Sequence, residues 1–124
     1  MSDNRTLMDE IHKLQKIHAD LAVISERTDE QRKLELVQLR RQLAMQIGVI
    51  SALADKNFLP GAEDIVGREF RSLLSAMRRG IALHQANWPA VKVDEQNSDY
   101  RQSIQQAREA NSRFRDWAKI NIGG

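Results

Sequence analysis

The sequence contains no cysteine, which excludes disulfide bonds, thiol nucleophiles and thiolate metal ligands. Only two prolines and six glycines occur, so little turn-forming material remains for a sheet of several strands. No stretch approaches the roughly 18 apolar residues that a membrane-spanning helix requires, and the first residues lack the apolar core of a secretory signal. We therefore expect a cytoplasmic protein that makes no contact with membranes.

The composition that is present suits one folded domain. The chain has 124 residues, of which 41% are hydrophobic and 29% are charged, so it is too short for two independent cores. Nineteen basic residues oppose seventeen acidic ones, and the net charge of +2 is a small excess rather than the strong positive charge of a typical nucleic-acid-binding protein. We treat residues 1–124 as a single domain.

Apolar residues recur at intervals of three and four in four segments, and this spacing predicts amphipathic helices. The first and third rows are formed by Leu7, Ile11, Leu14, Ile17, Leu21 and Ile24, and by Val66, Phe70, Leu73, Leu74, Met77 and Ile81. The second and fourth are formed by Leu36, Leu39, Leu43, Ile47, Ile50 and Ala54, widened by Val37, Val49 and Leu53, and by Tyr100, Ile104, Ala107, Phe114 and Trp117. We predict helices over residues 6–27, 29–56, 63–86 and 98–119.

The boundary between the first two helices allows two interpretations. Thr6 with Asp9 and Thr28 with Gln31 have the spacing of capping boxes, and the polar segment 25–33 separates the two apolar rows. No glycine or proline forces a turn there, so a single helix of about 50 residues is the alternative. The polar segment and the second cap favour an antiparallel hairpin.

The later boundaries carry stronger signals. Pro60 and Gly61 end the second helix, and Asp64 suits the start of the third. Pro89 ends that helix at or before Trp88, and the following loop, extended around Val91 and Val93, leads to Ser98 as the next N-cap. The predicted fold is all-α, a bundle of three to four helices with long antiparallel N-terminal helices.

No catalytic or metal-binding motif is found in the sequence. Asp9 and His12 share a helix face, but metal sites in helical bundles use such a pair from two helices, and there is no second pair. We interpret His18, beside the first apolar row, as a half-buried packing residue. Glycine-rich phosphate loops and nucleophile motifs are also missing, so we expect no enzyme activity, no cofactor and no metal.

His84, near the end of the third helix, is compatible with one alternative function. Histidine phosphotransfer domains are helical bundles of about this length with one exposed phosphate-accepting histidine. There the histidine lies in mid-helix near a lysine, whereas His84 lies at a helix end without one. A histidine favoured by the negative end of the helix dipole is the simpler interpretation.

An arginine strip on the third helix provides a second alternative. Between Phe70 and Val93 there is no acidic residue, whereas Arg71, Arg78 and Arg79 are present. Guanidinium groups match phosphate oxygens, so the strip would suit a regulator that binds nucleic acid. Aromatic residues, which stack on bases, make up only 5% of the chain, and we expect no nucleic acid partner.

Most of the aromatic side chains lie in the last third of the chain, where they form either core or a partner-binding surface. Trp117 lies three residues after Phe114 and so points to the same side of the last helix. We interpret this side as core, with Trp88 covering one end of the bundle. The alternative is that the tryptophans anchor a partner, because tryptophan and arginine are enriched at interfaces.

In length, helix content and lack of cysteine the chain resembles the small all-helical export chaperones of flagellar and type III secretion systems. The resemblance implies a module that shields an amphipathic segment of a protein partner, and it implies no site residues because no motif carries it. The wide second row leaves apolar surface for a second copy. We predict a non-enzymatic, homo-oligomeric protein–protein interaction module. Its predicted partner-binding residues are Arg71, Arg78, Arg79, His84, Trp88 and Trp117.

Overall fold

The computed structural model describes residues 2–27, 29–58, 64–89 and 98–123, which form helices and short connections. The elements are α1 (Ser2–Ser25), α2 (Gln31–Asn57), α3 (Ile65–Asn87), α4 (Ser98–Ala118) and a π-helical turn, η2 (Lys119–Gly123). The part of the chain that the structure describes contains no strand. The all-α prediction is therefore confirmed.

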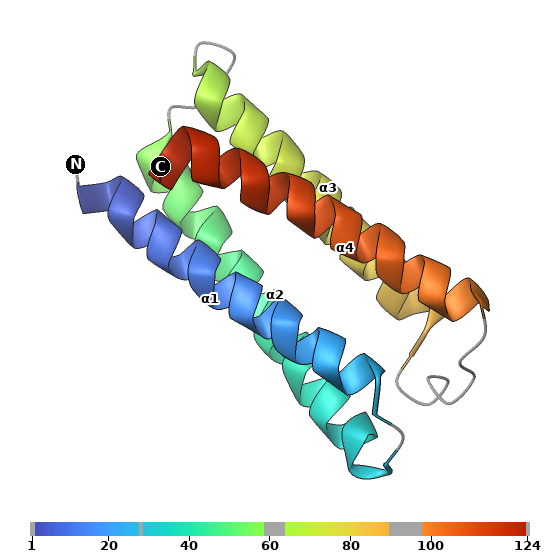
Figure 1. The fold of residues 1–124 in the computed structure, drawn as a ribbon. Coiled ribbons are helices and arrows are strands. Elements are labelled where there is room, and N and C mark those ends of the chain that lie inside the picture. Colours follow the sequence, from blue (N-terminus) through green and yellow to red (C-terminus); the bar gives the residue numbers. More distant parts are fainter. Residues whose placement is uncertain (1, 28, 59–63, 90–97, 124) are drawn as a thin grey trace.

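The four helices run alternately up and down as two antiparallel hairpins (Figure 1). Helix α1 packs mainly on α2, and α3 packs mainly on α4, with smaller contacts of α2 with α3 and of α1 with α4. The prediction of a hairpin in place of one long N-terminal helix is confirmed. We call the end that holds η2 and the start of α1 the η2 end, and the end that holds the α1–α2 turn the turn end.

The predicted cap of α1 is wrong. The helix begins at Ser2, so Thr6 lies inside it and cannot act as N-cap; Ser2 and Asp3 are themselves residue types that favour a helix start. Helix α2 begins at Gln31, two residues later than predicted, and its N-cap Glu30 makes no side-chain capping hydrogen bond. Thr28 lies outside the described residues.

Helices α3 and α4 lie close to their predicted positions. Asp64 caps α3, its Oδ1 accepting a hydrogen bond of 2.9 Å from the backbone N–H of Gly67. The helix ends at Asn87, before Pro89. The tail after α4 forms η2, and Gly123 there lies against Met8 of α1. Residues 59–63 and the expected extended positions at 91 and 93 lie outside the described ranges.

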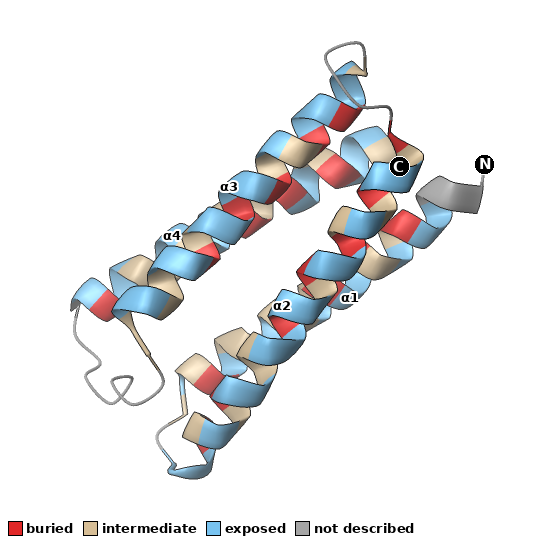
Figure 2. Cartoon of the chain, turned by 180° about the vertical axis from the view of Figure 1, so that it is seen from behind, coloured by how far each residue is buried: buried red, intermediate tan, exposed pale blue. Residues whose placement is uncertain are grey.

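The core follows the predicted apolar rows closely, and Figure 2 shows buried residues on the facing sides of the helices. Its main part is formed by Leu7, Ile11, Leu14, Leu43, Ile47, Ile50, Ala54, Phe58, Phe70, Leu74, Met77, Ile81, Phe114 and Ala118. A smaller cluster of Ile24, Leu36 and Tyr100 lies at the turn end. Three predicted members do not belong to the core, since Val37, Val49 and Val66 are exposed at the outer edges of their helices.

Aromatic rings fill the η2 end of the core. The ring centroid of Phe70 lies 5.2 Å from that of Phe58 and 5.3 Å from that of Phe114. Helix α3 comes so close to Phe58 that a Cβ added at Gly67 would lie 2.6 Å from the Phe58 Cβ. Gly67 therefore fixes how near the two segments approach.

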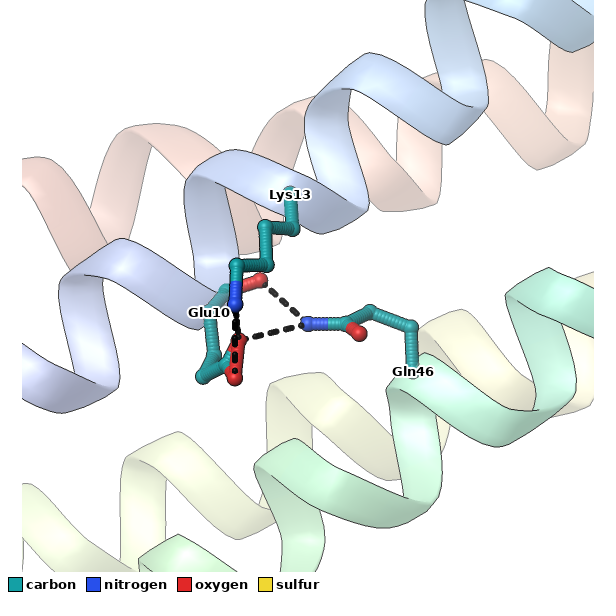
Figure 3. A network of polar contacts seen from close by, with 3 residues as sticks. All are labelled: Glu10, Lys13 and Gln46. Atoms are coloured by element: carbon teal, nitrogen blue, oxygen red, sulfur yellow. Dashed lines mark hydrogen bonds and ion pairs between the residues drawn. The ribbon is translucent and has the colours of Figure 1, made fainter.

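Two polar contacts join α1 to its neighbours. The Gln46 amide of α2 donates to the backbone carbonyl of Glu10 at 2.8 Å and to its Oε2 at 3.2 Å, while Lys13 pairs with the same carboxylate (Figure 3). These donors lower the pKa of Glu10, Lys13 having the larger effect. Asn111, buried in α4, exchanges two amide hydrogen bonds with Gln15, of 3.1 and 3.0 Å.

Candidate functional site

A cavity of about 80 Å³ lies between the four helices toward the turn end. Its apolar lining comes from Leu21, Ala22, Leu36, Leu43, Ile81, Ile104 and Ala107. Its polar lining includes one residue from each helix, namely His18, Arg40, His84 and Tyr100. None of the described residues that line it is aspartate or glutamate. The cavity is thus mostly apolar with a few converging polar groups, which is the usual composition of a small-molecule site.

Arg40 projects from the inward side of α2, between Leu36 and Leu43 in the buried row. Its Nη2 donates a hydrogen bond of 2.8 Å to the backbone carbonyl of Trp88. Across the described ranges, no carboxylate forms an ion pair with Arg40. Burial lowers the pKa of the guanidinium, because a charged group loses its hydration there. Arg40 is therefore a half-buried cation that lacks an anionic partner in this part of the structure.

Tyr100 contacts the rings of His84 and Trp88 on the α3–α4 side of the cavity, stacked in the first pair and T-shaped in the second. The Tyr100 ring lies 5.8 Å from the His84 ring and 5.1 Å from the Trp88 ring, measured between centroids. His84 Nδ1 lies 2.7 Å from the hydroxyl oxygen of Ser103. Burial, and to a lesser degree the charge of Arg40, lower the pKa of His84 to about 4. His84 is consequently neutral at pH 7.

His18 approaches the cavity from α1. Its Nε2 atom is buried, and within the described structure it has no hydrogen-bond partner. Burial lowers its pKa to about 4, because the protonated ring loses its hydration there. The position of His18 agrees with its interpretation as a half-buried side chain on the first apolar row. Buried polar atoms normally have a hydrogen-bond partner, however, so packing alone does not explain the unpaired nitrogen.

Only two of the six predicted partner-binding residues come together. His84 and Trp88 both contact Tyr100 at the turn end. Arg71 lies toward the η2 end, where it donates to the backbone carbonyl of Phe58 at 3.2 Å. Trp117 also lies there, against the aromatic core.

Arg71 and Trp117 both make contacts with other residues of the bundle. Arg71 Nε lies 3.8 Å from the Asp55 carboxylate, so the side chain joins α3 to the end of α2. The Trp117 ring lies 6.0 Å from the Phe70 ring, and its Nε1 donates to Glu69 at 3.0 Å. A role of these two residues in partner binding stays a prediction.

The remaining predicted features lie at the surface. Arg78 and Arg79 are exposed on α3, as are Asp9 and His12 on α1. Within the described residues, no group of three or more histidine, aspartate or glutamate side chains is placed to hold a metal ion. None of the helices described has the length and apolar character needed to cross a membrane.

Sequence reasoning missed Arg40, Tyr100 and the joint position of the histidines. The sequence does contain a signal for Arg40, because it lies four residues after Leu36 and three before Leu43, which is an inward position of a helix. A polar residue that interrupts an apolar row at such a position is a candidate site residue. The pattern within one helix does not show, however, which polar residues of the other helices lie opposite it.

A second surface feature lies on the outer side of α2. Leu34, Val37, Met45 and Val49 are exposed there, by 59%, 43%, 67% and 42%. Their spacing places them on one side of the helix, opposite the buried row. Apolar residues are spread around α2 more evenly than around α3 or α4, which makes α2 the least amphipathic of the three. We call this surface the outer row, and it also includes the exposed residues Arg41, Gly48 and Ala52.

No protein-family model, curated protein or solved structure matches the chain.

Proposed function

We propose that the protein is a non-enzymatic helical interaction module that associates with a second copy through the outer row of α2. The observation that carries this proposal is the run of exposed apolar side chains from Leu34 to Val49. A helix that is apolar on two opposite sides needs two partners, and the bundle covers only one side of α2. The row extends over about 27 Å from residue 34 to residue 52.

The outer row is complementary to itself in an antiparallel arrangement. A two-fold axis near residue 43 places Leu34 of one copy opposite Ala52 of the other, and a symmetric dimer repeats this contact on both sides of the axis. The small side chain of Ala52 leaves room for the larger side chain of Leu34. A Cβ added at Gly48 would meet no atom within 4 Å of its own chain, so this position allows close approach of a second helix.

The charged residue of the row is compatible with this pairing. The same axis places Arg41 of one copy opposite Met45 of the other. The aliphatic part of an arginine side chain packs on apolar surface while the guanidinium remains in water, and methionine adapts its shape to such neighbours. No buried charge is therefore created by the association.

The expected affinity is modest because one helix pair buries little area. Stable complexes bury about 1,200–2,000 Å² in total, and smaller interfaces are typical of transient encounters. We therefore expect a dissociation constant of about 10–500 µM, which corresponds to a weak dimer. Light scattering or sedimentation over that concentration range should show a mass that rises from monomer to dimer.

A pair of charge variants tests the surface. Met45→Glu, at the centre of the row, should abolish association without affecting folding, because the side chain is 67% exposed. Val23→Glu on α1 is the matched control, since Val23 is 63% exposed and lies outside the row. A native protein that stays monomeric throughout, or a loss of association in both variants, would contradict the proposal.

Because the chain lacks cysteine, cross-linking can test the register directly. The double variant Leu34→Cys with Ala52→Cys should form a disulfide-linked dimer on mild oxidation. Leu34→Cys alone should not, because the two copies of residue 34 lie far apart in the antiparallel pairing. Equal cross-linking of both variants would contradict this arrangement.

The other functions considered for the sequence receive less support from the geometry. A phosphate-accepting histidine must be accessible, whereas His84 is half-buried with its Nδ1 beside Ser103. In the arginine strip, Arg71 donates a hydrogen bond to the Phe58 carbonyl and pairs with the Asp55 carboxylate. Arg78 and Arg79 are left as a small basic surface on α3.

A further inference from the structure

The cavity at the turn end has the size of a small organic molecule. A single bound water takes about 10–15 Å³ on this measure of volume, so 80 Å³ accommodates roughly five to eight non-hydrogen atoms. Half of the lining side chains are aliphatic, and they favour a ligand with a hydrocarbon part. Nucleotides and peptides are much larger than this volume.

The charges around the cavity select an anion. Arg40 and Arg108 line it, and no described lining residue is acidic. The guanidinium of Arg40 is half-buried and uses one donor on the Trp88 carbonyl, which leaves N–H groups for a second acceptor. A half-buried cation gains from a counter-ion, and a carboxylate is the partner that its planar fork matches best.

His18 supplies a second polar contact. Its Nε2 is buried without a partner in the described structure, and in one neutral tautomer this nitrogen donates a hydrogen bond. A ligand acceptor in the cavity would satisfy it. Inorganic phosphate would leave the aliphatic lining without contacts, whereas an aliphatic carboxylate uses both parts of the cavity.

We propose that this cavity is a binding site for a short aliphatic carboxylate of about four to six carbons. Its carboxylate binds Arg40, and its chain lies among Leu36, Leu43 and Ile81. The ligand would bridge the two helical hairpins, because Arg40 and Leu43 belong to α2 and Ile81 belongs to α3. This site is separate from the outer row, which lies on the opposite side of α2.

Titration calorimetry or NMR titration with butanoate, pentanoate and hexanoate tests the proposal. A ligand with so few atoms should bind with a dissociation constant of about 0.1–10 mM. The alcohols of the same chain length should bind at least tenfold more weakly, because they lack the charge that pairs with Arg40. Equal binding of acids and alcohols, or no binding of the acids by 50 mM (about five times the weakest expected constant), would overturn the proposal.

Two pairs of variants locate the site. Arg40→Gln should weaken binding of pentanoate at least tenfold, whereas Arg113→Gln, which changes an exposed arginine of α4 outside the cavity lining, should leave it unchanged. Ala22→Leu should fill the cavity and block binding, whereas Ala19→Leu, which is exposed on α1, should not. Circular dichroism checks the folding of each variant. Unchanged binding in folded Arg40→Gln or Ala22→Leu would place the ligand elsewhere and overturn the assignment.

Discussion

Gly67 provides the sharpest test of the packing at the η2 end. In Gly67→Ala the new Cβ would lie 2.6 Å from the Cβ of Phe58 and 3.0 Å from the carboxylate of Asp64. Carbon atoms in contact are normally about 3.5–4.0 Å apart, so the overlap with Phe58 is about 1 Å. A Cβ moves only with its backbone, and α3 must therefore shift away from the end of α2.

The cost of this shift can be compared with the gain in helix propensity. Overpacking of this kind costs about 1–3 kcal/mol, and displacing the Asp64 cap costs up to about 1 kcal/mol more. Replacing glycine by alanine inside a helix returns about 0.5–1 kcal/mol. We expect Gly67→Ala to lower the free energy of unfolding by about 1–3 kcal/mol. For a chain of this size, that lowers the melting temperature by about 4–12 °C.

Gly80 and Gly48 are matched controls for the same substitution. A Cβ at Gly80 would lie 3.7 Å from the Ala110 Cβ, an ordinary contact, and a Cβ at Gly48 would meet nothing within 4 Å. Both alanine variants should gain about 0.5–1 kcal/mol. Urea unfolding followed by circular dichroism, at a few micromolar protein so that the proposed dimer is dissociated, measures all three. A Gly67→Ala protein as stable as Gly80→Ala would refute the reasoning.

Three further predictions concern polar and aromatic contacts. Between pH 6.5 and pH 5 the free energy of unfolding should fall as the pH is lowered, because the unfolded chain binds protons at His18 and His84. In the folded state both histidines stay neutral until about pH 4. Each histidine contributes at most about 1.4 kcal/mol per pH unit, and urea unfolding at each pH measures the change. Asn111→Ala should cost about 1–3 kcal/mol in the same assay, since the buried amide bonds to Gln15 are lost. Trp117→Ala should lower the melting temperature and cost about 2–4 kcal/mol, because the ring is only partly buried in the core.

Each of these predictions has a control and a contrary outcome. The variant His18→Gln should have a shallower pH profile than the native protein; a profile that is flat in the native protein would contradict the histidine assignment. Ser112→Ala, next to Asn111, should change stability by much less than 1 kcal/mol. A Trp117→Ala protein with unchanged melting but altered association would assign Trp117 to an interface instead of the core.

The sequence alone predicted the helices and most of the core. An apolar residue at every third or fourth position is a local property, and it identified the rows that contain Leu7, Leu43, Phe70 and Phe114. It also predicted the α1–α2 turn from a polar segment without glycine or proline. The misplaced start of α1 has a local cause too, because Thr6 satisfies the rule for a cap but the helix continues past it.

The candidate sites depended on the arrangement of the helices in space. His18, Arg40, His84 and Tyr100 come from four different helices, and the sequence around each of them does not show that they share a site. Whether Val37 and Val49 widen the core or face outward also depends on how α1 and α3 are placed around α2. Periodicity determines which side of a helix is apolar, whereas the relative position of two helices follows from how the side chains of both interdigitate. That packing is non-local, so only the tertiary structure decided which polar groups share a cavity and which apolar groups stay exposed.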